Sequence, residues 1–159
     1  ITEPGASWKH LRDPKNYDFR PKKGSPLVDA GLKTTKSHVP SKDSNFDFQR
    51  VVGRAPDIGA YEFGDKRYWI PGRQETIATT PIPKNNGKDV PLDTDLMFLE
   101  AYKVQSHRVL LGLSEDKLKL LKIMKDLKKN IVSLPALKRN TTYYWRVDAY
   151  DVMTKNWKL

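Results

Sequence analysis

The chain has 159 residues with 38% hydrophobic content, 11 Pro and 9 Gly, which is typical of a turn-rich β protein of one or two small domains rather than of a helical bundle. It contains no Cys, which excludes disulfides and thiolate metal sites, and no apolar run approaches the roughly 18 residues of a membrane span. Its formal net charge of +10 is spread along the chain, and such a diffuse field favours polyanionic partners only weakly.

The first half predicts very short β segments. Ile1 stands where an initiator Met would be expected, so we expect a fragment of a longer protein. From Asp18 to Gly64, short apolar segments such as those at Phe19 and Ile58 alternate with turn residues and are expected to be buried. This pattern fits stacked β coils better than a compact hairpin domain.

Two motifs in this half carry a family resemblance. Residues 24–31 are GSPLVDAG, and Arg54 is followed by PDIGAYEF at residues 56–63. Over residues 18–64 the pair is similar to the end of the right-handed parallel β-helix in secreted bacterial polysaccharide-degrading proteins such as polysaccharide lyases. The resemblance implies that the motifs flank a loop, close the last coils and leave the catalytic groove on upstream coils. It also implies a secreted or cell-surface location, with no cofactor here and any calcium held by the parent enzyme.

Three carboxylates of these motifs raise the question of catalysis or metal binding. Glycosidases need two carboxyl groups at a defined separation, and calcium needs several oxygens around one point. Asp29 precedes Ala-Gly and Asp57 follows a proline, both turn-like settings in which a carboxylate accepts backbone N–H bonds. The sequence therefore favours a structural role for Asp29, Asp57 and Glu62, with Arg54 as an ion-pair partner, over the catalytic and metal-binding alternatives.

Residues 65–75, DKRYWIPGRQE, are expected to link two domains at 1–64 and 76–159. Tyr68 and Trp69 are too apolar for a free tether, so we predict that they pack into the interface between the domains and stiffen the linker. The alternative is a sugar-stacking platform on the same two side chains, because aromatic faces suit sugar C–H groups.

The second half begins with strand patterns. Pro81 and Pro83 are typical of an edge strand, and residues 96–99 and 107–111 are predicted to form the next two strands. His107 has no second His or Cys at ligand spacing. We therefore predict that it is an ordinary surface residue.

Residues 115–134 fit two structures. Their apolar spacing allows a basic amphipathic helix that could dock on an anionic surface. Local alternation and the sequence NIVSL at 130–134 instead favour strands with a solvated lysine face. On the strand interpretation, Lys117, Lys119 and Lys122 are candidate contacts for an anionic polysaccharide.

The clearest pattern is LKRNTTYYWRVDAYD, which begins at Leu137. Strict alternation predicts a strand with Tyr143 and Trp145 on the core side. Leu137, Thr141 and Tyr143 have the i, i+4, i+6 spacing of the tyrosine corner, whose phenol hydrogen-bonds back to upstream backbone. The segment resembles strand F of a fibronectin type III-like domain, with Arg139 where that family often carries proline. Residues 156–159 are expected to form a short last strand.

Together these elements predict an all-β chain. The terminal coils or cap of a parallel β-helix (1–64) precede an immunoglobulin- or fibronectin type III-like β-sandwich (76–159). No Ser-His-Asp set, metal-ligand cluster or phosphate-binding glycine loop stands out in the sequence, so this chain is expected to be non-catalytic by itself.

The predicted role is that of end cap, spacer and weak glycan-binding module in a secreted polysaccharide lyase or glycoside hydrolase. Its expected partners are the upstream β-helix of the same protein and a polysaccharide. The alternatives are a dedicated binding module for acidic or sulfated polysaccharide and an interaction domain of a cell-surface protein. Nucleic acid is not an expected partner, because no recognition helix or base-stacking motif is present.

Overall fold

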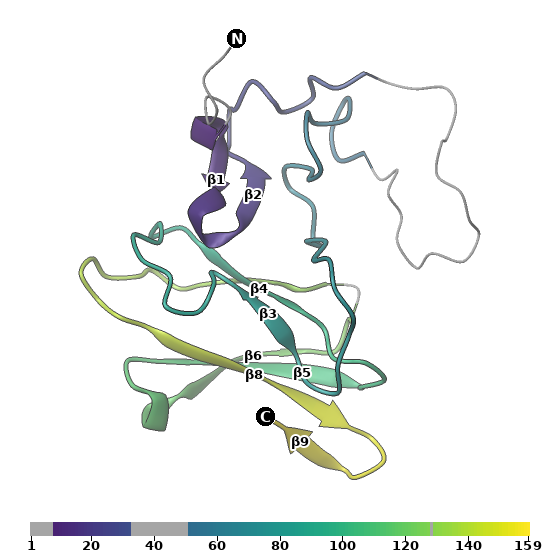
Figure 1. Ribbon diagram of the computed structural model, residues 1–159, viewed down its shortest axis with the longest axis vertical. Coiled ribbons are helices and arrows are strands. Elements are labelled where there is room, and N and C mark those ends of the chain that lie inside the picture. Colours follow the sequence, from purple (N-terminus) through teal and green to yellow (C-terminus); the bar gives the residue numbers. More distant parts are fainter. Residues whose placement is uncertain (1–7, 33–50, 128) are drawn as a thin grey trace. The chain divides into compact units, whose positions relative to one another are not determined.

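The computed structural model describes residues 8–32, 51–127 and 129–159. The chain divides into two compact units, Ile1–Asp65 and Lys66–Leu159. Regular structure in the described residues consists of antiparallel β-strands and short 3-10 helices, so the predicted all-β class is confirmed (Figure 1). None of the helices in these ranges has the length and apolar character needed to cross a membrane.

The described part of the first unit holds one small antiparallel sheet followed by turns. After the 3-10 helix η1 (Trp8–His10), β1 (Leu11–Asp13) pairs with β2 (Asp18–Pro21), and η2 (Pro14–Asn16) connects them. The residues of the expected loop at 33–50 lie outside the described ranges.

Burial in this unit differs from the sequence prediction. Phe19 is 36% exposed and Ile58 is 51% exposed, so the expectation that both are buried is wrong. In β2 the buried side of the alternation is polar instead: the Arg20 guanidinium donates to both carboxylate oxygens of Asp18, at 2.9 and 2.7 Å. A bidentate ion pair satisfies both charged groups, which lets them be buried where a hydrophobic residue was expected.

The second unit contains two antiparallel sheets. In the first, β3 (Thr79–Ile82), β4 (Asp95–Leu99) and β7 (Ile131–Ser133) lie in the order β3-β4-β7. In the second, β6 (Lys119–Met124), β5 (Ser106–Gly112), β8 (Tyr144–Asp151) and β9 (Asn156–Lys158) lie in the order β6-β5-β8-β9. The 3-10 helix η3 (Glu115–Lys117) precedes β6.

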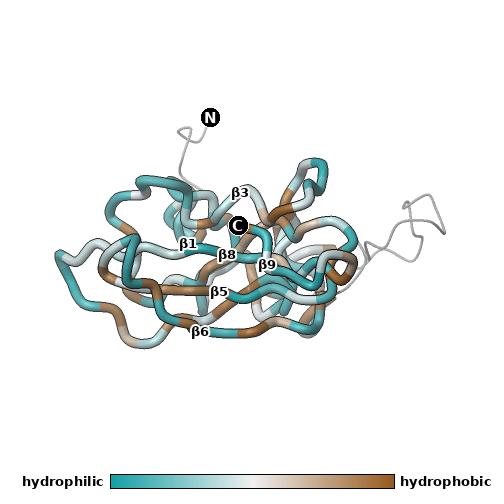
Figure 2. Tube along the Cα trace, turned by 90° about the horizontal axis from the view of Figure 1, so that it is seen from below, coloured by the Kyte–Doolittle hydropathy of each residue, from teal (hydrophilic) through white to brown (hydrophobic). Residues whose placement is uncertain are grey.

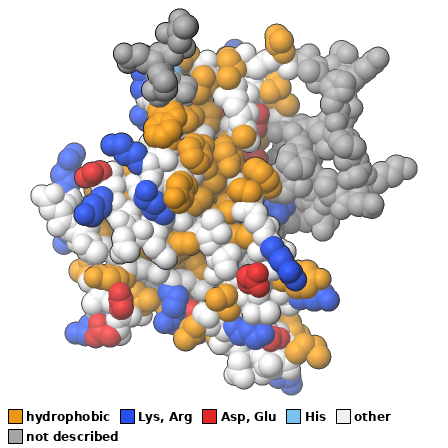
Figure 3. Space-filling model, in the orientation of Figure 1, with side chains coloured by type: hydrophobic (Ala, Val, Ile, Leu, Met, Phe, Trp, Pro, Cys, Tyr) orange, Lys and Arg blue, Asp and Glu red, His pale blue; other side chains and the backbone are white. Residues whose placement is uncertain are grey.

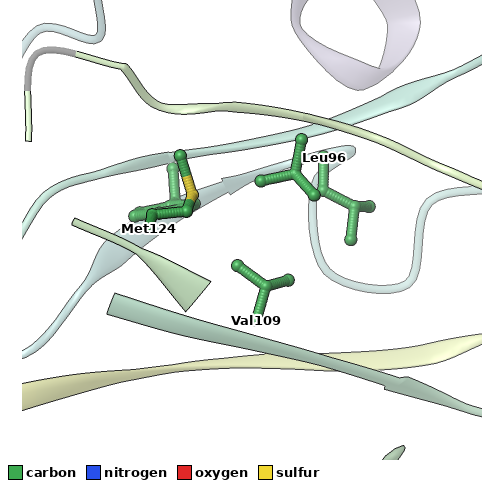
Figure 4. Close-up of a cluster of buried hydrophobic side chains, with 5 residues drawn as sticks. Leu96, Val109 and Met124 are labelled. Atoms are coloured by element: carbon green, nitrogen blue, oxygen red, sulfur yellow. The ribbon is translucent and has the colours of Figure 1, made fainter. Parts of the chain in front are cut away.

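A hydrophobic core lies where the two sheets face each other. Leu96 from β4 meets Val109 from β5 and Met124 from β6, and none of the three is more than 5% exposed (Figure 4). Phe98 and Val132 complete this buried cluster. Trp145 and Val147 of β8 pack against it while staying partly exposed. The predicted inward side of β8 is therefore correct, although its burial is incomplete.

The strand predictions for the second unit agree with the structure. Pro81 lies in β3, an edge strand, whereas Pro83 follows its last residue. The predicted strands at 96–99 and 107–111 correspond to β4 and β5. In the described part of 115–134, the short η3 is followed by the strands β6 and β7, so the amphipathic-helix alternative is wrong. Residues 119–124 are a strand because they pair with β5. Figure 2 shows hydrophobic and hydrophilic stretches alternating along β6.

His107 on β5 is buried, at 1% exposure, and the prediction of a surface residue is wrong. Its Nε2 accepts the backbone N–H of Ala101 at 3.1 Å, and its ring meets Phe98 edge-on at 5.2 Å between centroids. A polar ring can be buried when its nitrogen finds a partner, and this one ties the connection after β4 to the next sheet.

Candidate functional site

The first candidate site is the carboxylate cluster predicted in the first unit. Asp57, 5% exposed, accepts the backbone N–H of Asp29 on one oxygen at 2.8 Å and that of Phe63 on the other at 2.5 Å. Glu62 accepts the N–H of Asp57 on Oε1 and that of Val52 on Oε2, both at 3.1 Å. Each of these two carboxylates therefore uses both oxygens on backbone donors.

Asp29 holds the turn that follows residue 52. Its Oδ1 accepts the backbone N–H groups of Ala55 and Arg54, at 3.0 and 2.6 Å. These two bonds, with the Ala55 bond the stronger influence, lower the pKa of Asp29. The Arg54 guanidinium lies 3.7 Å from Oδ2, and its side chain is 92% exposed, so this pair adds little stability.

Backbone bonds join the same two segments. The N–H of Gly31 donates to the Pro56 carbonyl at 2.7 Å, and the N–H of Ile58 donates to the Leu27 carbonyl at 2.8 Å. A Cβ at Gly31 would lie only 2.7 Å from the Pro56 oxygen, which explains why this position has no side chain. Segments 27–31 and 52–63 are thus fastened together by carboxylates, backbone bonds and close backbone approach.

This arrangement is suited to holding turns. A carboxylate that accepts two backbone N–H bonds is fixed in orientation by them and satisfies two backbone donors of the surrounding turns. Within residues 8–32, 51–127 and 129–159, no group of three or more His, Asp or Glu side chains is placed to bind a metal ion.

The tyrosine-corner residues form the second cluster. The Tyr143 hydroxyl accepts the backbone N–H of Lys138 at 3.0 Å, the upstream bond that the spacing predicts. The Thr141 hydroxyl donates to the Arg139 carbonyl at 3.0 Å, which holds the turn ahead of β8. Leu137 is half-buried before this turn. Both bonds form with Arg139 in the turn, at the position where a proline was the alternative.

The two linker aromatics differ in exposure. Tyr68 is 2% exposed, and its backbone N–H and C=O both bond to the Asn130 side-chain amide, each at 2.8 Å. Tyr68 therefore cannot serve as a sugar-stacking platform, and that candidate role is wrong. Trp69 is 37% exposed. Both residues belong to the second unit, and their packing into a domain interface stays a prediction.

The three candidate lysines all lie at or on the outer strand of the four-stranded sheet. Lys117 ends η3, and Lys119 and Lys122 lie on β6; all three side chains are exposed. Their hydrophobic neighbours Leu120 and Ile123 are 56% and 48% exposed. Lysines on an edge strand also discourage pairing with another chain.

Sequence reasoning missed a polar network on the outer face of this sheet. Asp148, fully buried, pairs with Arg108 and with Arg146, both at 2.7 Å. The Arg108 guanidinium also lies over the Trp157 ring, 4.6 Å from its centroid. Alternation along β8 predicts that Arg146 and Asp148 share the face opposite Trp145. That Arg108 and Trp157 join them in one network follows only from the pairing of β8 with β5 and β9.

Comparisons of the chain with protein-family models, curated proteins and solved structures find no match.

Proposed function

We propose that the second unit is a fibronectin type III-like sandwich. Its three- and four-stranded antiparallel sheets, with orders β3-β4-β7 and β6-β5-β8-β9, support this, because sandwiches of that kind divide their strands in the same way. The Tyr143 hydrogen bond to the Lys138 backbone is the observation that carries the proposal.

For the first unit the proposal is the terminal turns of a parallel β-helix. The motifs at 24–31 and 56–63 support it through their resemblance, and the bonds between their segments suit a closing end. The strands β1 and β2 pair antiparallel, so this part of the proposal rests on the motifs.

The chain as a whole is then a non-catalytic C-terminal part of a secreted bacterial polysaccharide lyase or glycoside hydrolase. It acts as end cap and spacer and binds anionic glycan weakly. Support for the non-catalytic role comes from Asp57 and Glu62, whose carboxylate oxygens already accept backbone N–H bonds. The purified chain should release neither unsaturated products nor reducing ends from acidic polysaccharides, and activity abolished by Asp57→Asn would contradict this.

Weak electrostatic glycan binding is supported by the exposed amines of Lys117, Lys119 and Lys122. None of the three forms an ion pair within the described part of the chain, so their charges are open to an external anion. On the face in Figure 3, basic side chains are scattered rather than gathered in one patch. Scattered amines can attract sulfate or carboxylate groups without selecting a sugar.

Affinity electrophoresis on sulfated and neutral polysaccharide gels at two salt concentrations tests this binding. Retardation on the sulfated gel should weaken steeply with salt, because the Debye length falls from about 10 Å at 0.1 M to about 3 Å at 1 M. Replacing Lys117, Lys119 and Lys122 with Ala should reduce retardation more than the matched replacement of Lys23, Lys138 and Lys155, which are also exposed. Equal effects of both triple variants would contradict a contact centred on β6.

Trp69 supports the second candidate, a neutral-glycan contact, because it is the more exposed linker aromatic. Retention on the neutral gel that survives high salt and disappears in Trp69→Ala would favour this alternative over the electrostatic one.

A further inference from the structure

We propose that Met153, in the turn between β8 and β9 (Figure 1), is a modification site at which hydrogen peroxide forms methionine sulfoxide in the folded protein. The chain has 3 Met. Met97 is fully buried and Met124 is 5% exposed, whereas Met153 is 91% exposed. The folded chain therefore presents one thioether to solvent and shields two.

The turn that carries Met153 is held by other side chains. Asp151 Oδ1 accepts the backbone N–H groups of Met153 at 2.8 Å and Thr154 at 3.4 Å. Asp151 Oδ2 also pairs with the Lys158 ammonium at 2.6 Å, and the Asn156 side-chain amide donates to the Thr154 carbonyl at 3.0 Å. The Met153 side chain contributes none of these bonds, so its chemistry can change while the turn persists.

The reaction is a two-electron transfer of oxygen. A sulfur lone pair attacks one peroxide oxygen, the S–O bond forms as the O–O bond breaks, and the departing hydroxide takes the remaining proton to leave as water. The sulfur is oxidised and the peroxide is reduced. Sulfoxide reductases specific for the two epimers would reverse the change.

Oxidation would alter the character of the turn without altering the fold. Val152 is 51% exposed beside Met153, so the two form a small apolar tip. A sulfoxide makes that tip polar, whereas the same change at Met97 or Met124 would place a polar group in the core. In the folded chain, peroxide therefore changes the polarity of this one turn and leaves the core unchanged.

Peroxide treatment of the full folded chain, followed by peptide mass mapping over time, tests the proposal. Met153 should gain one oxygen atom at least about ten-fold faster than Met97 or Met124, because the buried thioethers react only when the structure opens. In denaturant the three should react at similar rates. Met153→Leu should remove the fast uptake and leave the slow ones unchanged.

The melting temperature of the chain oxidised only at Met153 should equal that of the untreated chain. Comparable rates for all three methionines in the folded chain, or faster oxidation of Met97 or Met124, would overturn the assignment. A lowered melting temperature would show that the Met153 side chain supports the fold. That result would overturn the proposal that oxidation changes only the turn.

Discussion

Burial shifts the pKa values of two titratable groups near the end of β4 in opposite directions. Burial lowers the pKa of His107 from 6.5 to about 4, because the charged imidazole is removed from water. Burial likewise raises the pKa of Glu100, with the nearby charge of Arg67 partly opposing it. Each group is thus held toward its neutral form, and each gives a different dependence of stability on pH.

For His107, the unfolded chain takes up a proton at a higher pH than the folded chain does. The free energy of unfolding should therefore fall as pH falls below 6.5 and level off below about 4, with a total loss of about 3 kcal/mol from this group. Urea unfolding of the wild type and His107→Gln between pH 7 and 4 measures it, and the variant should lack this part of the loss. Parallel pH curves for the two proteins would contradict the prediction, and His10→Gln serves as the control.

For Glu100 the sign is reversed. The unfolded chain loses its carboxyl proton near the ordinary value of 4.5, below the raised pKa of the folded chain, so stability should fall as pH rises through this range. Glu100→Gln is expected to stabilise the chain at pH 7 and to be nearly neutral at low pH. Thermal unfolding compared with the exposed control Glu115→Gln checks this, and a destabilised Glu100→Gln at pH 7 would show that the charged carboxylate is needed.

A substitution at Asp57 tests whether the carboxylate cluster stabilises the first unit. Asp57→Asn leaves one acceptor oxygen and brings an amide donor against a backbone N–H, so the local free energy of opening should fall by about 2 kcal/mol. Hydrogen exchange of segments 27–31 and 52–63 measures this directly. The control Asp116→Asn makes the same charge change at an exposed position and should leave hydrogen exchange of segments 27–31 and 52–63 unaltered.

The hydrogen bond that closes the corner ahead of β8 can be tested with adjacent tyrosines. Tyr143→Phe removes the acceptor of the Lys138 N–H and should lower the free energy of unfolding by about 0.5–1 kcal/mol, toward the low end because water can replace that bond. Tyr144→Phe is the matched control, and urea unfolding compares them. Equal losses would mean that the corner bond adds nothing beyond the loss of a hydroxyl.

The sequence predicted the elements of the second unit better than their side-chain environments. Alternation at Trp145 and Val147 gave the inward face of β8, and the spacing of Tyr143 gave its corner. His107 was misplaced, since its burial depends on an N–H from Ala101 in a different segment. Packing was expected for Tyr68 but its partner was not, because Asn130, which holds its backbone, is 62 positions away. Partners that are distant in sequence leave no local pattern.

The second unit contains the elements of an independent fold. Its core cluster draws on β4, β5, β6 and β7, and the bonds from Asn130 begin and end within it. In the described residues of the first unit, β1 and β2 form one small sheet, and the cluster of Asp29, Asp57 and Glu62 joins segments 27–31 and 52–63. A two-stranded sheet is marginally stable in water, so the described part of the first unit is expected to be the less stable of the two units.

The difference between the units predicts different behaviour in isolation. Residues 66–159 expressed alone should fold, because the hydrophobic core cluster and the hydrogen bonds of the buried Asn130 side chain lie inside that range. Thermal unfolding followed by the fluorescence of Trp69, Trp145 and Trp157 should be cooperative. Its midpoint should lie close to that of the full chain carrying Trp8→Phe, which has the same three probes. Residues 1–65 alone should show little protection from hydrogen exchange. A second unit that stays unfolded by itself, or a first unit that is fully protected by itself, would contradict this division of stability.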